Sequence, residues 1–291
     1  MPRKRREYRC HPGGPGGSDY TYSDKPVIYV DFFDAMRFVT WLENGQPTGA
    51  QDASTTEDGV YAISDGLSET RAASATFFIP SEDEWYKAAY HKNDGVTSTY
   101  WDYPTSTDSV PNNNLPSADR GNSANFFDGA YTTGNQFFPM TDVGAYTFSE
   151  SPYGTFDQGG NINELNEGVV FSARVIRSGS WGAVSDILLS SFQGVASPLN
   201  YNNIKGFRVA SIPEADADID NNGIVDGFDF LKWQLEMSPN PFSQTDLALW
   251  ESQYGGPPPV SAVSAVPEPA TCIALLLGMM AMLFRRDVVV S

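Results

Sequence analysis

Cysteine and histidine are scarce in this chain, and their scarcity narrows the chemistry it can carry. The 291 residues include two cysteines, Cys10 and Cys272, and two histidines, His11 and His91. The cysteines stand near opposite ends, which excludes a disulfide framework or a Cys-x-x-Cys metal site. A zinc site with several histidines or a Ser-His-Asp triad would depend on His91. We expect His91, which follows a helical segment, to be solvated instead.

Basic residues are also few. Lys and Arg number 18 against 36 Asp and Glu, and the formal net charge is −18. Binding to a phosphate backbone needs clustered cations, and the dense basic run at residues 3–6 stands alone near the start of the chain. We therefore expect no nucleic-acid partner. The length fits one sizeable domain with smaller attachments.

Long apolar runs are limited to one, Ala270–Phe284, which is uncharged and followed by Arg285 and Arg286. As a helix it would be about 22 Å long against a hydrocarbon core of about 30 Å, so it would span a membrane marginally. A buried C-terminal helix is the alternative. The lack of a polar face and the Pro-rich linker before the run favour a membrane helix. The arginines predict a cytoplasmic C-terminus, with the preceding residues outside.

The segment before this run carries a short proline motif. A linker, residues 255–266, leads to Pro-Glu-Pro, and the motif, the apolar run and the arginines together resemble the PEP-CTERM sorting tail of bacterial envelope proteins, here residues 267–286. The residues of the motif are Pro267, Glu268 and Pro269, with Arg285 and Arg286 beyond the run. The resemblance implies an exported protein of the cell envelope or extracellular space. It would be membrane-anchored before sorting and handled by an exosortase-type sorting machinery.

Such a protein should begin with a secretory signal. Residues 1–25 have a basic start but no apolar h-region, only Gly, Pro, Ser and Tyr in its place. We expect this segment to be disordered or truncated, so that the natural product is longer at its N-terminus.

Oxygen-bearing side chains recur at fixed intervals in residues 218–229. They fall at positions 1, 3, 5, 9 and 12 of a twelve-residue loop, with glycine at position 6 and a backbone carbonyl at position 7, as calcium coordination requires. Carboxylates this close repel one another unless a cation lies between them. A solvated acidic turn is the alternative. The predicted calcium ligands are Asp218, Asp220, Asn222, the Ile224 carbonyl, Asp226 and Asp229.

Two short helical patterns accompany the loop. Residues 230–235 follow the loop as an amphipathic helix, and residues 246–251 repeat part of the same pattern. In each copy a Trp stands four residues after an Asp. Paired helices with such loops resemble the dockerin module, here residues 216–254, in which the last ligand is also Asp. The second copy lacks its own loop, because residues 240–245 supply no ligand set. We expect one ion, and a spacer or weak docking role rather than a full cohesin-binding interface.

The main domain occupies residues 26–212. Helices are predicted over residues 34–42 and, after a capping box at Ser81–Glu84, over residues 85–90. Ala35, Phe38, Val39 and Leu42 are expected on one face of the first helix. Short segments rich in Gly, Asn, Thr and aromatic residues lie around the helices. This mixture predicts an α+β domain with much irregular structure.

Five motifs occur in order along this domain. They are Pro26-Val-x-x-Val30 before Asp34-Ala35, Ile79-Pro80-Ser81-Glu82-Asp83-Glu84-Trp85 with Ala88-Ala89, Gly154 then Gly160-Asn161-x-x-Glu164, Arg177-Ser-Gly-Ser-Trp181, and Gly206-Phe-Arg-Val209. Together they resemble the formylglycine-generating enzyme (sulfatase-modifying factor) family, which implies its variant of the C-type-lectin-like fold. The family's first strands have no counterpart that we recognise before Pro26.

Working members of that family oxidise a sulfatase cysteine to formylglycine with copper held by two cysteines. The resemblance puts Ala183 and Leu188 at those positions, and neither can bind soft Cu(I), which needs thiolates. We therefore expect a non-catalytic domain that acts in binding or assembly, with a protein or glycan ligand on its irregular loops, at rings such as Tyr131, Phe137 and Phe138. The alternative is a metal-dependent oxidase of the same family, for example with iron on His or carboxylate ligands.

Calcium is the cofactor that the resemblance leaves in place in this domain. The family resemblance implies one calcium ion at Asn161, the Ile162 carbonyl and Glu164. Asn163 and Leu165 replace the tryptophans usual in that motif. It also implies part of a second site at Asn125 and the Phe126 carbonyl. Arg208 is expected to form a salt bridge at the edge of the core, with a role in substrate binding as the less favoured alternative.

Overall fold

The computed structural model describes residues 24–137, 139–212, 217–220, 222–235, 237 and 242–255. The chain divides into two compact units after Ile212. The helices and strands of the first unit are α1 (Phe32–Glu43), β1 (Phe77–Phe78), α2 (Glu82–Tyr90), the 3-10 helix η2 (Pro116–Ala118), β2 (Asn163–Val170), β3 (Ala173–Arg177), the 3-10 helix η3 (Ser185–Leu188), β4 (Gly194–Ala196), β5 (Lys205–Phe207) and β6 (Ala210–Ser211).

The first predicted helix is confirmed as α1, which begins two residues before the predicted start. Asp31 caps it, because its carboxylate accepts the Asp34 backbone N–H at 3.0 Å while the Asp34 carboxylate accepts the Asp31 N–H. The buried face differs in part from the prediction. Ala35 and Val39 are buried as expected, but Phe38 and Leu42 are only half-buried. The other buried positions of the helix are Phe32, Met36 and Thr40.

The predicted capping box at Ser81 is also confirmed, and α2 follows it directly. Trp85, Ala89 and Tyr90 form its buried side. The prediction that His91 is solvated is wrong, since His91 is 3% exposed. Its Nδ1 accepts the backbone N–H of Asn93 at 3.1 Å and lies 2.8 Å from the Tyr153 hydroxyl. Two loops therefore close over the end of α2 and bury the ring.

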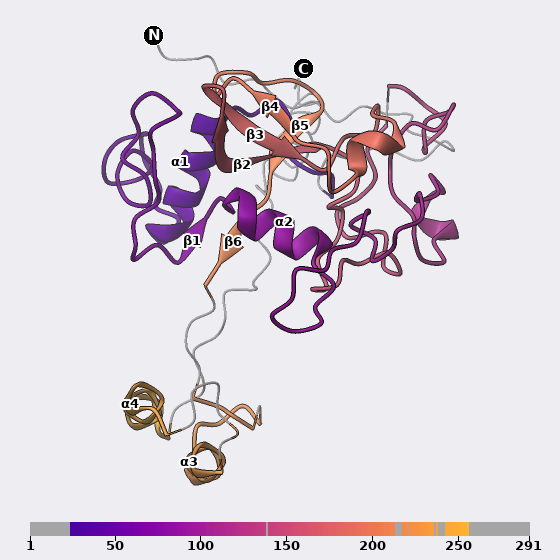
Figure 1. Cartoon of the computed structure of the whole chain (residues 1–291). Coiled ribbons are helices and arrows are strands. Elements are labelled where there is room, and N and C mark those ends of the chain that lie inside the picture. Colours follow the sequence, from indigo (N-terminus) through magenta and orange to yellow (C-terminus); the bar gives the residue numbers. More distant parts are fainter. Residues whose placement is uncertain are drawn as a thin grey trace, which may run out of the picture. The chain divides into compact units, whose positions relative to one another are not determined.

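A four-stranded sheet in the order β4-β3-β2-β5 forms the centre of the first unit. Strand β2 runs parallel to β5 and antiparallel to β3, and a register shift between Leu165 and Val169 bends the pair. Helices α1 and α2 lie against this sheet (Figure 1), and Leu165 of β2 joins the buried residues of α1 in the largest core cluster. Strands β1 and β6 form a separate two-stranded sheet.

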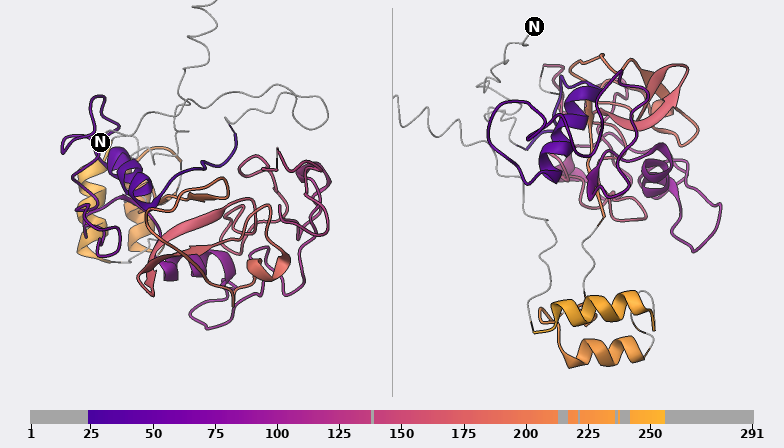
Figure 2. Two further views of the ribbon diagram at one scale, coloured as in Figure 1. Left: turned by 90° about the horizontal axis from the view of Figure 1, so that it is seen from above. Right: turned by 90° about the vertical axis from the view of Figure 1, so that its left-hand side faces the viewer.

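The second unit contains two helices in its described part, α3 (Gly227–Gln234) and α4 (Gln244–Gln253). They lie side by side (Figure 2), and the Phe230 and Trp250 ring centroids are 4.9 Å apart. The Gly255 N–H donates to the Val225 carbonyl at 2.9 Å, which brings the end of α4 to the start of α3 and makes the pair antiparallel. Both predicted helices are thus confirmed. Each begins earlier than predicted, because Asp226 and Ser243 cap them.

No helix within the described residues is long and apolar enough to cross a membrane. The predicted membrane run, Ala270–Phe284, the motif at Pro267–Pro269 and both arginines lie outside those residues. The sorting tail therefore stays a prediction from the sequence.

Candidate calcium loop and the positions of the family site

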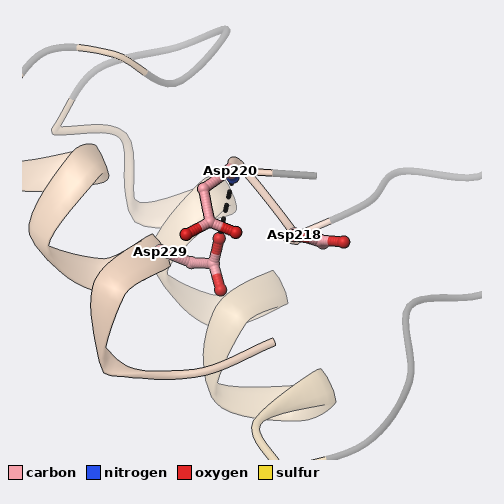
Figure 3. A group of neighbouring side chains, drawn as sticks. All are labelled: Asp218, Asp220 and Asp229. Carbon is pink, nitrogen blue, oxygen red and sulfur yellow. Dashed lines mark hydrogen bonds between the residues drawn. The ribbon is translucent and has the colours of Figure 1, made fainter. Parts of the chain in front are cut away.

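Three carboxylates meet where the second unit begins. Asp218, Asp220 and Asp229 each offer one oxygen, and these oxygens lie within 4.8 Å of one another. Figure 3 shows the Asp220 and Asp229 carboxylates facing each other, with Asp218 beside them. A Ca²⁺–O bond measures about 2.3–2.6 Å, so oxygens at this separation can share one ion. Asp229 is fully buried and Asp218 is 6% exposed, which makes their mutual repulsion costly without a cation.

Backbone N–H groups hold these carboxylates in place. The Asp218 oxygens accept from Asn222 at 3.0 Å and from Gly223 at 2.8 Å. The Asp229 oxygens accept from Asp220 at 3.0 Å and from Asp226 at 2.8 Å. Gly223 has φ +89°, the left-handed turn that position 6 requires. A carboxylate oxygen can accept more than one contact, so these bonds do not by themselves prevent metal binding.

The other predicted ligands surround this group. Asp226 caps α3, with its Oδ1 accepting the Phe228 N–H at 2.7 Å. The Asn222 Oδ1 accepts the Ile224 N–H at 2.8 Å, which turns the chain at position 7 of the loop. The structure thus brings Asp218, Asp220 and Asp229 together and places the remaining predicted ligands in the same short loop. The donor set is entirely oxygen, as calcium prefers.

Helix α4 supplies contacts to the loop that the sequence did not reveal. Trp250 donates its indole N–H to the Asp226 carbonyl at 2.7 Å, and the Gln253 Oε1 accepts the Ala217 N–H at 2.9 Å. In the sequence, only the repeated Asp–Trp spacing drew attention to Trp250. That spacing does not indicate that its indole would bond to Asp226, 24 residues earlier in the chain. The loop is consequently held from both of its ends by the second helix.

In the first unit, Leu188 stands at one of the two positions that the resemblance aligns with copper-binding cysteines, and it belongs to the hydrophobic core. Leu188 is fully buried and packs with Tyr103, Ala124 and Phe126. A side chain added at Gly179 would meet the Leu188 Cδ1 at 2.9 Å, so little space remains around it. Ala183 holds the adjacent turn through backbone bonds alone, accepting the Phe127 N–H at 2.8 Å. Two hydrocarbon side chains here offer no donor that fits copper.

Asn125 and Asn161, predicted in two separate sites, lie in direct contact. The Asn125 Nδ2 donates to the Asn161 Oδ1 at 3.1 Å, and the Asn161 N–H donates to the Asn125 carbonyl at 2.7 Å. The Asn161 Oδ1 also accepts the Thr141 N–H at 3.1 Å. Gly160 permits this approach, since a Cβ there would lie 2.1 Å from the Asn125 carbonyl oxygen. The Asn125 Oδ1 is buried without a hydrogen-bond partner among the described residues.

Glu164, the third predicted ligand beside Asn161 and Ile162, faces a cation. Its two oxygens accept from the Arg208 guanidinium, with an Nη2–Oε1 distance of 2.7 Å, and its Oε2 also accepts the Trp85 indole N–H at 2.7 Å. Burial lowers the pKa of Arg208, but Glu164 outweighs burial and raises it. The expected core-edge salt bridge of Arg208 is confirmed. A calcium ion at Asn161, Ile162 and Glu164 would have to compete with this guanidinium, and that site stays a prediction. The second site, at Asn125 and the Phe126 carbonyl, also stays a prediction.

Asp157 is an unpredicted titratable group close to this ion pair. It lines a small polar pocket with Ser123, Tyr146 and Ser149, and its φ is +57°. Burial raises the pKa of Asp157 to about 6, against the opposing effects of the Gly144 N–H and Arg208. No local pattern in the sequence marks this residue, because the groups that bury it come from distant segments.

Aromatic rings collect on the irregular loops of the first unit. The Tyr131 ring lies 5.1 Å from Phe127 and 5.7 Å from Trp181, measured between centroids. Phe137 is mostly exposed. Phe138, which the sequence also suggested for this surface, lies outside the described residues.

Comparison with known proteins identifies the family of the first unit. Residues 5–212 match the family described as sulfatase-modifying factor enzyme 1-like domain, and the chain therefore belongs to this family. The mixed α/β fold of the first unit, with its curled sheets, is consistent with the family's C-type-lectin-like fold. The dockerin and PEP-CTERM resemblances remain predictions. A comparison with curated protein sequences yields no match.

Several solved structures are similar to the chain at low sequence identity. The crystal structure of CarF is 21% identical with a TM-score of 0.43, over 70% of this chain and 72% of CarF. Treponema denticola variable protein 1 is 18% identical with a TM-score of 0.43, over 71% of this chain and 76% of that one. PvdO from Pseudomonas aeruginosa is 17% identical with a TM-score of 0.38, over 65% and 62% of the two chains.

Proposed function

We propose that this protein is a non-catalytic member of the sulfatase-modifying-factor family. It is exported, sorted to a bacterial cell surface, and acts there in binding or assembly. A calcium-binding module joins its main domain to the sorting tail. The observation that carries the non-catalytic role is the replacement of both copper-binding cysteines.

The donor chemistry supports the loss of oxidase activity. The two positions of the family's copper-binding cysteines hold Ala183 and the fully buried Leu188 here. The described residues include no cysteine. Of the two histidines, His91 lies within the described residues. Its ring nitrogens already contact the Tyr153 hydroxyl, the Asn93 N–H and the Thr97 carbonyl. A metal-dependent oxidase would need thiolate, imidazole or free carboxylate ligands in the family site. The packed hydrocarbon around Leu188 supplies none of these.

The calcium role rests on the loop at 218–229. It combines an all-oxygen donor set, oxygens close enough to share an ion, and a glycine in the required conformation. Extracellular calcium is millimolar, and loops of extracellular modules commonly bind in that range. An exported protein would therefore hold the ion once outside the cytoplasm.

The sorting role rests on the tail. Pro267-Glu268-Pro269, the uncharged run and the two arginines match the three parts of a PEP-CTERM signal, so exosortase-type machinery is the proposed partner. The ligand of the displayed domain would be a protein or glycan bound at the aromatic loops, for which the partly exposed Tyr131 and Trp181 rings are suited.

One experiment separates this role from that of a related oxidase. The full chain is incubated with copper, oxygen and a Cys-x-Pro-x-Arg peptide, and the aldehyde product is sought by mass spectrometry. A family member with both cysteines serves as the positive control, and a Cys10→Ser/Cys272→Ser variant removes the remaining thiols. We expect no aldehyde from either form of this chain. Turnover by the variant without thiols would overturn the proposal.

A further inference from the structure

Helix α3 carries apolar side chains on two faces. The inner face holds Phe230 and Trp233, and Phe230 packs on Trp250 of α4. The outer face holds Phe228, Leu231 and Leu235, which are 67%, 47% and 61% exposed. Their i, i+3, i+7 spacing places them in one line along the helix. We call these three residues the α3 stripe. A single exposed apolar residue is ordinary, but an aligned group indicates a surface that something covers.

Helix α4 cannot be the element that covers the stripe. The Trp250–Asp226 and Gly255–Val225 hydrogen bonds fix α4 at the inner face. Within the described residues this unit consists of the loop, the two helices and part of the turn between them, and none of these elements covers the stripe. An occupant would therefore come from outside the described residues.

We propose that the chain's own apolar run, Ala270–Phe284, docks on the α3 stripe before the tail enters a membrane. The run carries no charge, so it can lie on an apolar face flanked by an acidic loop without burying a charged group. As a helix it would be about 22 Å long, ample for α3, whose eight residues span about 12 Å. In the docked state the run would be shielded from water while the protein is still soluble.

The linker is long enough for this contact. Residues 256–269 separate the end of the described chain from the run, and a Pro-rich segment of that length reaches up to about 40 Å at about 3.1 Å per residue. That distance exceeds the length of α3, so every position along the stripe is within reach. A tether of this kind gives an effective concentration in the millimolar range. A second copy of the chain at micromolar concentration is therefore outcompeted by roughly a thousandfold. The docking goes beyond the proposed sorting role and does not depend on exosortase processing.

Cys272 lies inside the run and provides the test. In the full chain with Cys10→Ser, the variant Leu231→Cys puts a thiol in the middle of the stripe. Ala248→Cys, at an exposed position on α4, is the matched control at similar tether length. We expect mild oxidation to form an intramolecular disulfide to Cys272 at least tenfold faster from position 231 than from position 248. Peptide mapping after proteolysis identifies the linkage, and circular dichroism checks that both variants fold.

A second substitution tests the role of the stripe itself. Adding Phe228→Asp to the Leu231→Cys chain introduces a charge beside the docking position and should reduce the rate to that of the control. Equal rates from positions 231 and 248 would overturn the proposal. Disulfide-linked dimers as the main product of Leu231→Cys would also overturn it, since they would assign the stripe to a second copy.

Discussion

Trp250 donates its indole N–H to the carbonyl oxygen of Asp226 at 2.7 Å. Asp226 is position 9 of the predicted calcium loop and also the N-cap of α3. The bond therefore joins α4 to the residue at which the loop becomes a helix. Gly255 repeats this link one residue earlier, at Val225. Ion binding and helix pairing should consequently stabilise each other.

The first prediction concerns this bond. Trp250→Phe removes one hydrogen bond, worth about 1 kcal/mol, and should weaken calcium binding up to about fivefold. The matched control is Trp233→Phe, because the buried Trp233 Nε1 has no hydrogen-bond partner among the described residues. Calcium titration of both variants checks the prediction. Equal losses of affinity would show that the rings matter and the bond does not.

The second prediction concerns the former copper position. Leu188→Ala should lower the free energy of unfolding by about 2–5 kcal/mol, since it opens a cavity beside Tyr103 and Phe126. Val184→Ala, at an exposed position nearby, should change it by less than about 0.5 kcal/mol. Urea unfolding followed by circular dichroism measures both. A negligible effect at Leu188 would contradict its role as a core residue.

The third prediction concerns the Glu164–Arg208 ion pair. Arg208→Met leaves the Glu164 carboxylate buried without its partner and should cost about 3–5 kcal/mol of stability. Asp142→Asn breaks the exposed Lys25–Asp142 pair and should cost at most about 1 kcal/mol. Thermal unfolding compares the two. If Glu164 instead serves mainly as a calcium ligand, EDTA should destabilise an Asp229→Asn chain, whose loop site is already impaired, as much as Arg208→Met destabilises the wild type.

The fourth prediction concerns pH. The Asp157 pKa is raised by burial to about 6 in the folded chain, above its ordinary value of 3.8. The folded state thus holds this proton more tightly than the unfolded state. Its stabilising contribution is present below about pH 4 and is lost as the pH rises through about 6, with a change on the order of 3 kcal/mol.

Asp157→Asn should remove this dependence and make the protein more stable than the wild type at pH 7. Asp128→Asn, at an exposed position, should leave the pH profile unchanged. Unfolding free energies at several pH values decide the matter. A wild-type advantage over Asp157→Asn that grows toward neutral pH would contradict the assigned direction of the shift.

Local patterns in the sequence predicted the parts of this structure that depend on local contacts. The Ser81 capping box, α1 and α2, and the helices that flank the loop all follow from spacings of three or four residues. The closeness of Asp218, Asp220 and Asp229 is predictable for the same reason, since all three lie within twelve residues. The strands were harder, because most are two to five residues long and too short for a clear periodicity.

Contacts between distant segments explain what the sequence could not predict. Glu164 looked like a calcium ligand from its motif, but its partner Arg208 comes 44 residues later, directly after β5, the strand that pairs with β2. His91 looked exposed at the end of a helix, and Tyr153 covers it from 62 residues away. The Asn125–Asn161 contact likewise spans 36 residues. Residue type and spacing do not record such pairings.

We propose that the loop of the second unit binds one calcium ion. Calorimetric titration with calcium tests it most directly, comparing the wild type with Asp229→Asn, which keeps the side-chain shape but removes the buried charge. The proposal predicts that the variant binds one calcium fewer per chain. Binding of the same number of ions with unchanged affinity in both proteins would contradict it.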